Sequence, residues 1–211
     1  MTRERSAWAL AVSYFAAVAT CGWLGHAHAL SPADFASTPV GVLHGRVWTL
    51  FSSGLMVAGA PAVWQLLAAG AGAFVLGRLC GATTFWHVAV VGHVGSALLA
   101  YAALGLLVLA GVTSSGTSSL VNPDFGISCV WFATLGALLA LLSTRAMSAD
   151  WTTHRELPLA VLCAAAMFVP TGVVGDGLTT AEHSLAFVLG AIAMCSPARI
   201  SRSSATLSRA R

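Results

Sequence analysis

The sequence predicts an all-α membrane protein: a polytopic six-helix bundle with a long outer loop between helices one and two. Of its 211 residues, 57% are hydrophobic and 8% are charged, and the mean hydropathy is +0.84. A soluble domain usually carries about 25% charged residues. The apolar residues suffice for six spans of about 20 residues each. This composition excludes an ordinary soluble enzyme and a disordered chain, and a net charge of +3 excludes the basic stripe of a nucleic-acid-binding protein.

Each expected helix is a run of apolar residues that is bounded by polar or turn-forming ones. We place the six spans at residues 7–25, 57–78, 84–110, 125–143, 157–174 and 181–196. No domain boundary and no internal repeat is visible, so residues 1–211 are expected to form a single transmembrane domain. Residues 197–211 carry four arginines and are expected to form a basic cytoplasmic tail.

The apolar stretch from Val47 to Leu79 is too long for one span. We therefore expect Trp48–Met56 to form an interfacial or re-entrant piece. The second helix then begins near Gly59–Pro61, because proline in a first helical turn costs no intrahelical hydrogen bond. Residues 25–48, which contain two prolines and three histidines, form the expected outer loop.

The arginines predict how the chain is oriented. All ten cationic residues are arginine, and an intracellular N-terminus places nine of them on the cytoplasmic side and only Arg46 outside. An excess of positive charge marks the cytoplasmic side of a membrane protein. We therefore expect a multi-pass protein of the cell membrane with both termini in the cytoplasm. The first apolar run is long for a signal peptide, which favours an uncleaved first helix.

Polar residues within the spans are the best candidates for function, because each is costly in lipid unless it is paired or functional. Five residues qualify: Gln65, His87, His93, Ser128 and His183. For His93 we expect a position facing the bundle, where a hydroxyl or a carbonyl satisfies the ring.

Two of these residues are expected at matching depths. Asp124 is a candidate N-cap for the fourth span, and Thr179 with Glu182 fits a capping box for the sixth. These caps would place Ser128 and His183 each four residues into a helix that enters from the outer side.

A serine and a histidine at one depth are suited to nucleophilic catalysis. Imidazole can take the proton from a serine hydroxyl, and a helix N-terminus offers N–H groups to an oxyanion. Gly126 would allow a close approach of the backbone. An equally weighted alternative is that Ser128 bonds to its own helix and His183 to a loop carbonyl.

The order of these features resembles the rhomboid family of intramembrane serine proteases. The resemblance runs from about Arg46 to Gly190. Its motifs are Gly126-Ile-Ser128 with Gly136, His183 with Ala186 and Gly190, the stretch Arg46–Ser52, and the turn Leu76–Gly81.

The resemblance implies roles for individual residues. Ser128 would be the nucleophile, His183 the general base, and the Ser128 N–H and the Gln65 amide the oxyanion donors. Phe132 stands where the family often has a tyrosine that stacks on the histidine. Gly126, Gly136, Ala186 and Gly190 would support the site by close packing.

The sequence departs from the family pattern at four positions, one of which is Gly77 in place of a glutamate near the end of helix two. Pro61 and Gln65 replace a histidine and an asparagine on helix two, and Cys129 replaces a small residue after the serine. The chain thus resembles a divergent, actinobacterial type of rhomboid-like protein.

Three functions follow as hypotheses. The first is a rhomboid-like serine endopeptidase that cleaves membrane-protein segments near the outer leaflet through a Ser-His dyad. The alternative is a catalytically inactive rhomboid-like protein that binds transmembrane segments in trafficking or quality control. A small transporter ranks third, since it would need polar groups on broken, repeated helices. The expected partners are a transmembrane substrate or client and the lipid bilayer, with no nucleic acid, no cofactor and no metal.

Overall fold

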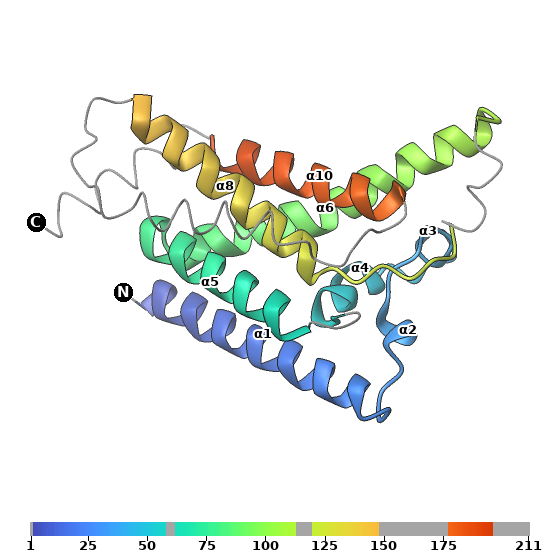
Figure 1. Cartoon of the computed structure of the whole chain (residues 1–211), viewed down its shortest axis with the longest axis horizontal. Helices are drawn as coiled ribbons and strands as arrows, with labels where there is room; N and C mark the ends of the chain where they lie inside the picture. Colours follow the sequence, from blue (N-terminus) through green and yellow to red (C-terminus); the bar gives the residue numbers. More distant parts are fainter. Residues whose placement is uncertain (1, 58–61, 113–119, 148–176, 196–211) are drawn as a thin grey trace, which may run out of the picture.

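A computed structural model describes residues 2–57, 62–112, 120–147 and 177–195. Within these ranges the regular structure is helical, apart from one isolated β-bridge. The long helices are α1 (Thr2–His26), α5 (Ala62–Cys80), α6 (Ala82–Leu109), α8 (Ile127–Met147) and α10 (Gly177–Met194) (Figure 1). The expected fifth span, residues 157–174, and the tail 197–211 lie outside the described residues.

Four of the described helices are long and apolar enough to cross a membrane. The qualifying stretches are Glu4–His26, Ala82–Leu109, Ile127–Thr144 and Gly177–Met194. In α5 the apolar stretch is shorter, Gln65–Cys80. Large apolar side chains remain exposed along these helices, among them Val12, Leu106 and Ile192. Such a surface is costly in water and suits lipid, so the helices indicate a membrane protein.

Helix α8 lies at the centre of the described bundle and packs against α10, α6 and α5. Its inward residues Ala133, Ala137 and Leu141 are buried, in one cluster with Leu76 of α5 and Phe85 of α6. Alanine predominates because small side chains allow helices to pack closely where lipid supplies no hydrophobic driving force between them.

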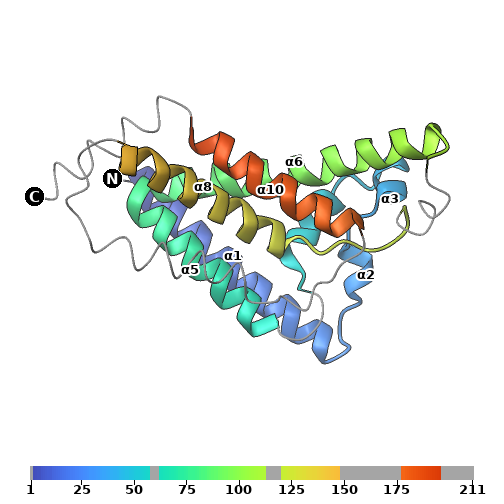
Figure 2. The same ribbon diagram turned by 45° about the horizontal axis from the view of Figure 1, so that its top comes forward.

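The long helices run between two ends of the bundle. Helices α8 and α10 both begin at one end, whereas α1 and α6 begin at the other (Figures 1 and 2). At that second end, the Glu4 carboxylate accepts hydrogen bonds from the backbone N–H of Ala82 and the hydroxyl of Thr83. A carboxylate at a helix N-terminus satisfies free N–H groups and favours the helix dipole, so α1 caps α6.

The segment between α1 and α5 lies at the end where α8 and α10 begin (Figure 1). It contains the short helices α2 (Pro32–Phe35), α3 (Pro39–Leu43) and α4 (Thr49–Ser52) and the single turn η1 (Ser53–Leu55). The expected separate piece Trp48–Met56 thus corresponds to α4 and η1. It is anchored to α6, because Leu50 is buried with Ala97 and Tyr101.

Candidate active site

The bundle brings Ser128 of α8 and His183 of α10 into direct contact. His183 Nε2 and Ser128 Oγ are 2.7 Å apart and hydrogen-bonded. Both residues are buried, with 9% of Ser128 and 8% of His183 exposed. The contact expected from the sequence is therefore present, and its distance is within the range needed for proton transfer from a hydroxyl to an imidazole.

The prediction that Asp124 is the N-cap of α8 is wrong. The helix begins at Ile127, so Ser128 is its second residue and Asp124 lies outside it. The backbone of Asp124 is instead paired with Ser37: Asp124 N–H donates to the Ser37 carbonyl at 2.8 Å, and Ser37 N–H to the Asp124 carbonyl at 3.2 Å. This long-range pairing keeps Asp124 extended and delays the start of the helix.

The prediction that Thr179 and Glu182 form a capping box at the start of α10 is also wrong. The helix begins at Gly177, so Thr179 and Glu182 lie within it, and Glu182 is fully buried. Leu178 packs against the buried cluster around Leu50 and Tyr101. Burial of this side chain stabilises the additional turn. His183 nevertheless lies in the second turn of α10, close to the level of Ser128.

The ring of His183 is held by an aromatic neighbour. Phe132, one turn beyond Ser128 on α8, stacks on it with ring centroids 4.6 Å apart and an interplanar angle of 14°. Among the described residues no carboxylate bonds to the imidazole, so stacking fixes its plane where a triad would use an aspartate.

Glycines let α8 and α10 approach closely enough for this contact. A Cβ on Gly136 would overlap the carbonyl oxygen of Phe187, and one on Gly190 would overlap the carbonyl oxygen of Ala133. Ala186, between His183 and Gly190, is completely buried at the same interface. The three small residues occupy the packing positions expected from the sequence.

Gln65 lies in the first turns of α5 and is 8% exposed. Within the described residues no hydrogen bond joins it to Ser128 or His183. Pro61, which also differs from the family pattern, lies outside the described residues. An oxyanion role for Gln65 therefore stays a prediction.

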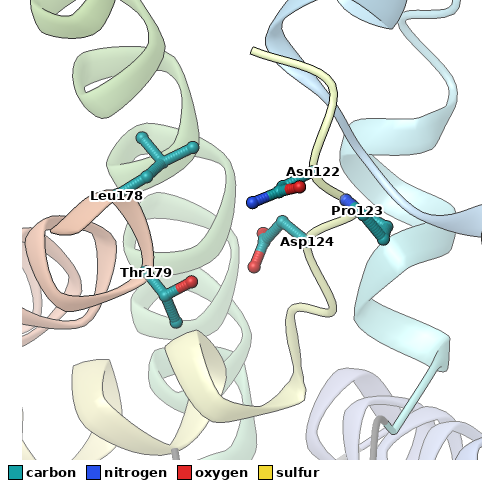
Figure 3. Close-up of a pocket in the computed structure, with 5 residues that line it drawn as sticks. All are labelled: Asn122, Pro123, Asp124, Leu178 and Thr179. Atoms are coloured by element: carbon teal, nitrogen blue, oxygen red, sulfur yellow. The ribbon is translucent and has the colours of Figure 1, made fainter. Parts of the chain in front are cut away.

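A pocket of about 220 Å³ opens at the ends of the two helices that carry the dyad. It is lined by Asn122, Pro123, Asp124, Leu178 and Thr179. Figure 3 shows Asn122 and Asp124 on one side, facing Leu178 and Thr179 on the other. Asp124 and Thr179 each precede a dyad residue by four positions. A mostly polar cavity thus lies close to the beginning of both helices.

The sequence reasoning missed one cluster beside the dyad. His93, in the middle of α6, is buried and hydrogen-bonded through Nε2 to the hydroxyl of Ser53 at 3.3 Å. The expectation of a hydroxyl partner for His93 is confirmed at Nε2, whereas Nδ1 is buried without a hydrogen-bond partner among the described residues. The Nε2 partner could not be found from the sequence, because Ser53 lies in a short turn with no periodic pattern.

No metal site is assembled in the described part of the chain, where no group of three or more histidine, cysteine or acidic residues gathers. In comparisons with known proteins, no family model matches the chain, and no curated protein and no solved structure is significantly similar to it. The functional argument therefore depends on the geometry of the site.

Proposed function

We propose that this chain is a rhomboid-like intramembrane serine endopeptidase that cleaves segments of other membrane proteins. The observation that carries the proposal is the 2.7 Å hydrogen bond between His183 Nε2 and Ser128 Oγ inside a bundle of membrane-type helices. A buried serine that only needed a partner could bond to its own helix. The contact with an imidazole from another helix favours activation of the hydroxyl.

The proposed reaction follows the usual course of acyl transfer. His183 takes the proton of Ser128 as Oγ attacks the scissile carbonyl, and the tetrahedral intermediate forms. His183 then gives that proton to the leaving amine as the C–N bond breaks. Water, deprotonated by His183, hydrolyses the acyl-enzyme, and the serine regains its proton.

The start of α8 favours stabilisation of the oxyanion. The first four N–H groups of an α-helix have no intrahelical partner, and Ser128 is the second residue of α8. Its N–H and the positive end of the helix dipole can receive the negative oxygen. The Gln65 amide is the proposed second donor.

The site's place in the bundle suggests which part of a substrate is cut. The arginine distribution favours cytoplasmic termini, which puts the beginnings of α8 and α10 near the outer leaflet of the cell membrane. Water can enter there through the pocket at Asp124 and Thr179. A transmembrane substrate must unwind locally to present its backbone, so we expect small or helix-breaking residues at the cut.

Labelling with a fluorophosphonate tests the proposal without a known substrate. We expect the purified protein to be labelled covalently, and Ser128→Ala and His183→Ala to abolish the label. Ser184→Ala is the matched control, because this exposed neighbour of His183 bonds only to the Thr180 carbonyl. It should be labelled like the wild type.

A second candidate is the catalytically inactive rhomboid-like protein that binds transmembrane segments. It is favoured by Gln65 and Cys129, because both differ from the residues that the rhomboid pattern has at these positions. A folded wild-type protein that takes up no label would support this binder and exclude the peptidase.

A further inference from the structure

A second network of contacts adjoins the turn that precedes Ser128. Gly126, two residues before Ser128, donates its backbone N–H to the Ser53 carbonyl at 3.0 Å. The hydroxyl of Ser53 bonds to His93 Nε2 at 3.3 Å. One residue of η1 thus joins the start of α8 to the middle of α6.

The ring of His93 also fills the space beside Gly126. A Cβ on Gly126 would overlap the imidazole, with Cε1 the nearest atom. On the other side, a Cβ on Gly54 would lie 3.1 Å from His93 Nε2. The imidazole therefore packs against two glycines, one in η1 and one in the turn before Ser128.

Helix α1 also contacts this turn, η1. The hydroxyl of Tyr14 donates to the Gly54 carbonyl at 2.6 Å. Since Ser53 is completely buried and His93 is 6% exposed, water cannot easily replace these bonds. Loss of a buried partner would leave polar groups unsatisfied, which lowers the stability of the fold.

We infer that His93 is a positioning residue that sets where the Ser128 hydroxyl and N–H lie relative to His183. The inference rests on the proposed function. Among the described residues no hydrogen bond joins His93 to Ser128 or His183. His93 acts through Gly126 by shape and through Ser53 by hydrogen bonding. A displacement of about 1 Å at a reacting group can slow a reaction about 100-fold.

The first test separates hydrogen bonding from filling of space, with the rate of fluorophosphonate labelling as readout. His93→Gln keeps a group that can bond well to the Ser53 hydroxyl, whereas His93→Met fills similar space with a thioether that is only a weak acceptor. We expect His93→Met to be labelled about 10- to 100-fold more slowly, and His93→Gln to recover most of the rate. Thr20→Ala is the control, because this exposed hydroxyl on α1 donates to the Ala16 carbonyl of the same helix. It should leave the labelling rate unchanged.

The second test reads stability and does not depend on catalysis. Gly126→Ala should lower the melting temperature because the added methyl meets the imidazole. Adding His93→Ala should recover part of the melting temperature that Gly126→Ala loses, although His93→Ala alone is destabilising. Such a compensating effect is expected of residues in contact and not of distant, independent sites.

The outcomes distinguish this inference from the proposed function. A folded His93→Met variant with the wild-type labelling rate would overturn the positioning role and leave the peptidase standing. A wild type that takes up no label would overturn the peptidase. The melting temperatures of Gly126→Ala with and without His93→Ala would then decide alone whether His93 packs against Gly126. If adding His93→Ala does not raise the melting temperature of the Gly126→Ala variant, the imidazole does not pack against Gly126 and the inference fails.

Discussion

The hydroxyl of Ser128 has two neighbours that compete for its proton. His183 Nε2 lies 2.7 Å away, whereas the carbonyl of Phe125 lies 3.4 Å away. Hydrogen bonds from a hydroxyl are strongest near 2.7 Å and weaken at longer distances. The histidine is therefore the preferred acceptor, and the local bond within the turn is the weaker of the two.

The stacking of Phe132 on His183 gives a prediction at the scale of one side chain. Aromatic pairs contribute about 0.5–1.5 kcal/mol beyond their buried area. Phe132→Leu should therefore slow fluorophosphonate labelling about 2- to 10-fold, because the imidazole loses its fixed plane. Phe132→Tyr keeps the aromatic face and should retain most of the rate. Equal rates for the leucine and tyrosine variants would show that stacking does not orient the base.

At the scale of single residues, the sequence predicted the site from polar side chains that are unusual within a membrane span. Ser128, His183 and His93 were singled out because polar groups in lipid are costly, and each has a polar partner in the structure. Ser53 was not singled out, since its burial depends on packing against α6. No local pattern encodes that contact.

At the scale of helices, the approach of α8 to α10 gives a second prediction. Gly190→Ala would press a methyl group into the Ala133 carbonyl, and overpacking costs about 1–3 kcal/mol. We expect a lower melting temperature in detergent and slower labelling, because the helices that carry Ser128 and His183 would separate.

Gly70 on α5 is the matched control for this change. No atom lies within 4 Å of a Cβ built there, so Gly70→Ala adds only the better helix propensity of alanine, about 1 kcal/mol. Its melting temperature should be unchanged or higher. If Gly190→Ala were equally harmless, close packing of the two helices would not position the dyad.

The helix starts show where reasoning from sequence failed. Asp124 and Thr179 are good caps by residue type, yet neither caps its helix. The backbone of Asp124 is paired with Ser37, and Leu178 extends α10 by packing on a distant cluster. Local propensity is a weak preference, and tertiary contacts of this kind override it. The existence of both helices, which depends on long apolar runs, was predicted correctly.

For the whole molecule, the arrangement of helix ends gives a prediction about the membrane. Helices α1 and α10 end at opposite ends of the bundle (Figure 1). His28 follows the end of α1, Cys195 follows the end of α10, and both residues are exposed. The arginines predict that His28 faces outward. In intact cells, a membrane-impermeant maleimide should label the His28→Cys variant, and Cys195 only after permeabilisation.

The reverse pattern, with Cys195 labelled from outside and His28→Cys protected, would contradict the predicted orientation. It would move the dyad to the cytoplasmic leaflet and leave its chemistry unchanged. Composition predicted the membrane character of the chain, but orientation depends on the position of a few arginines. It therefore needs this separate measurement.

Under the proposed function, the bundle holds one activated serine within a membrane. The most direct measurement is the site of the covalent adduct after fluorophosphonate treatment, located by tandem mass spectrometry on the intact, folded protein. We predict a single adduct on Ser128, formed at a measurable rate in the wild type and absent from His183→Ala. An adduct on another residue, or none on a folded wild type, would contradict the Ser128–His183 dyad.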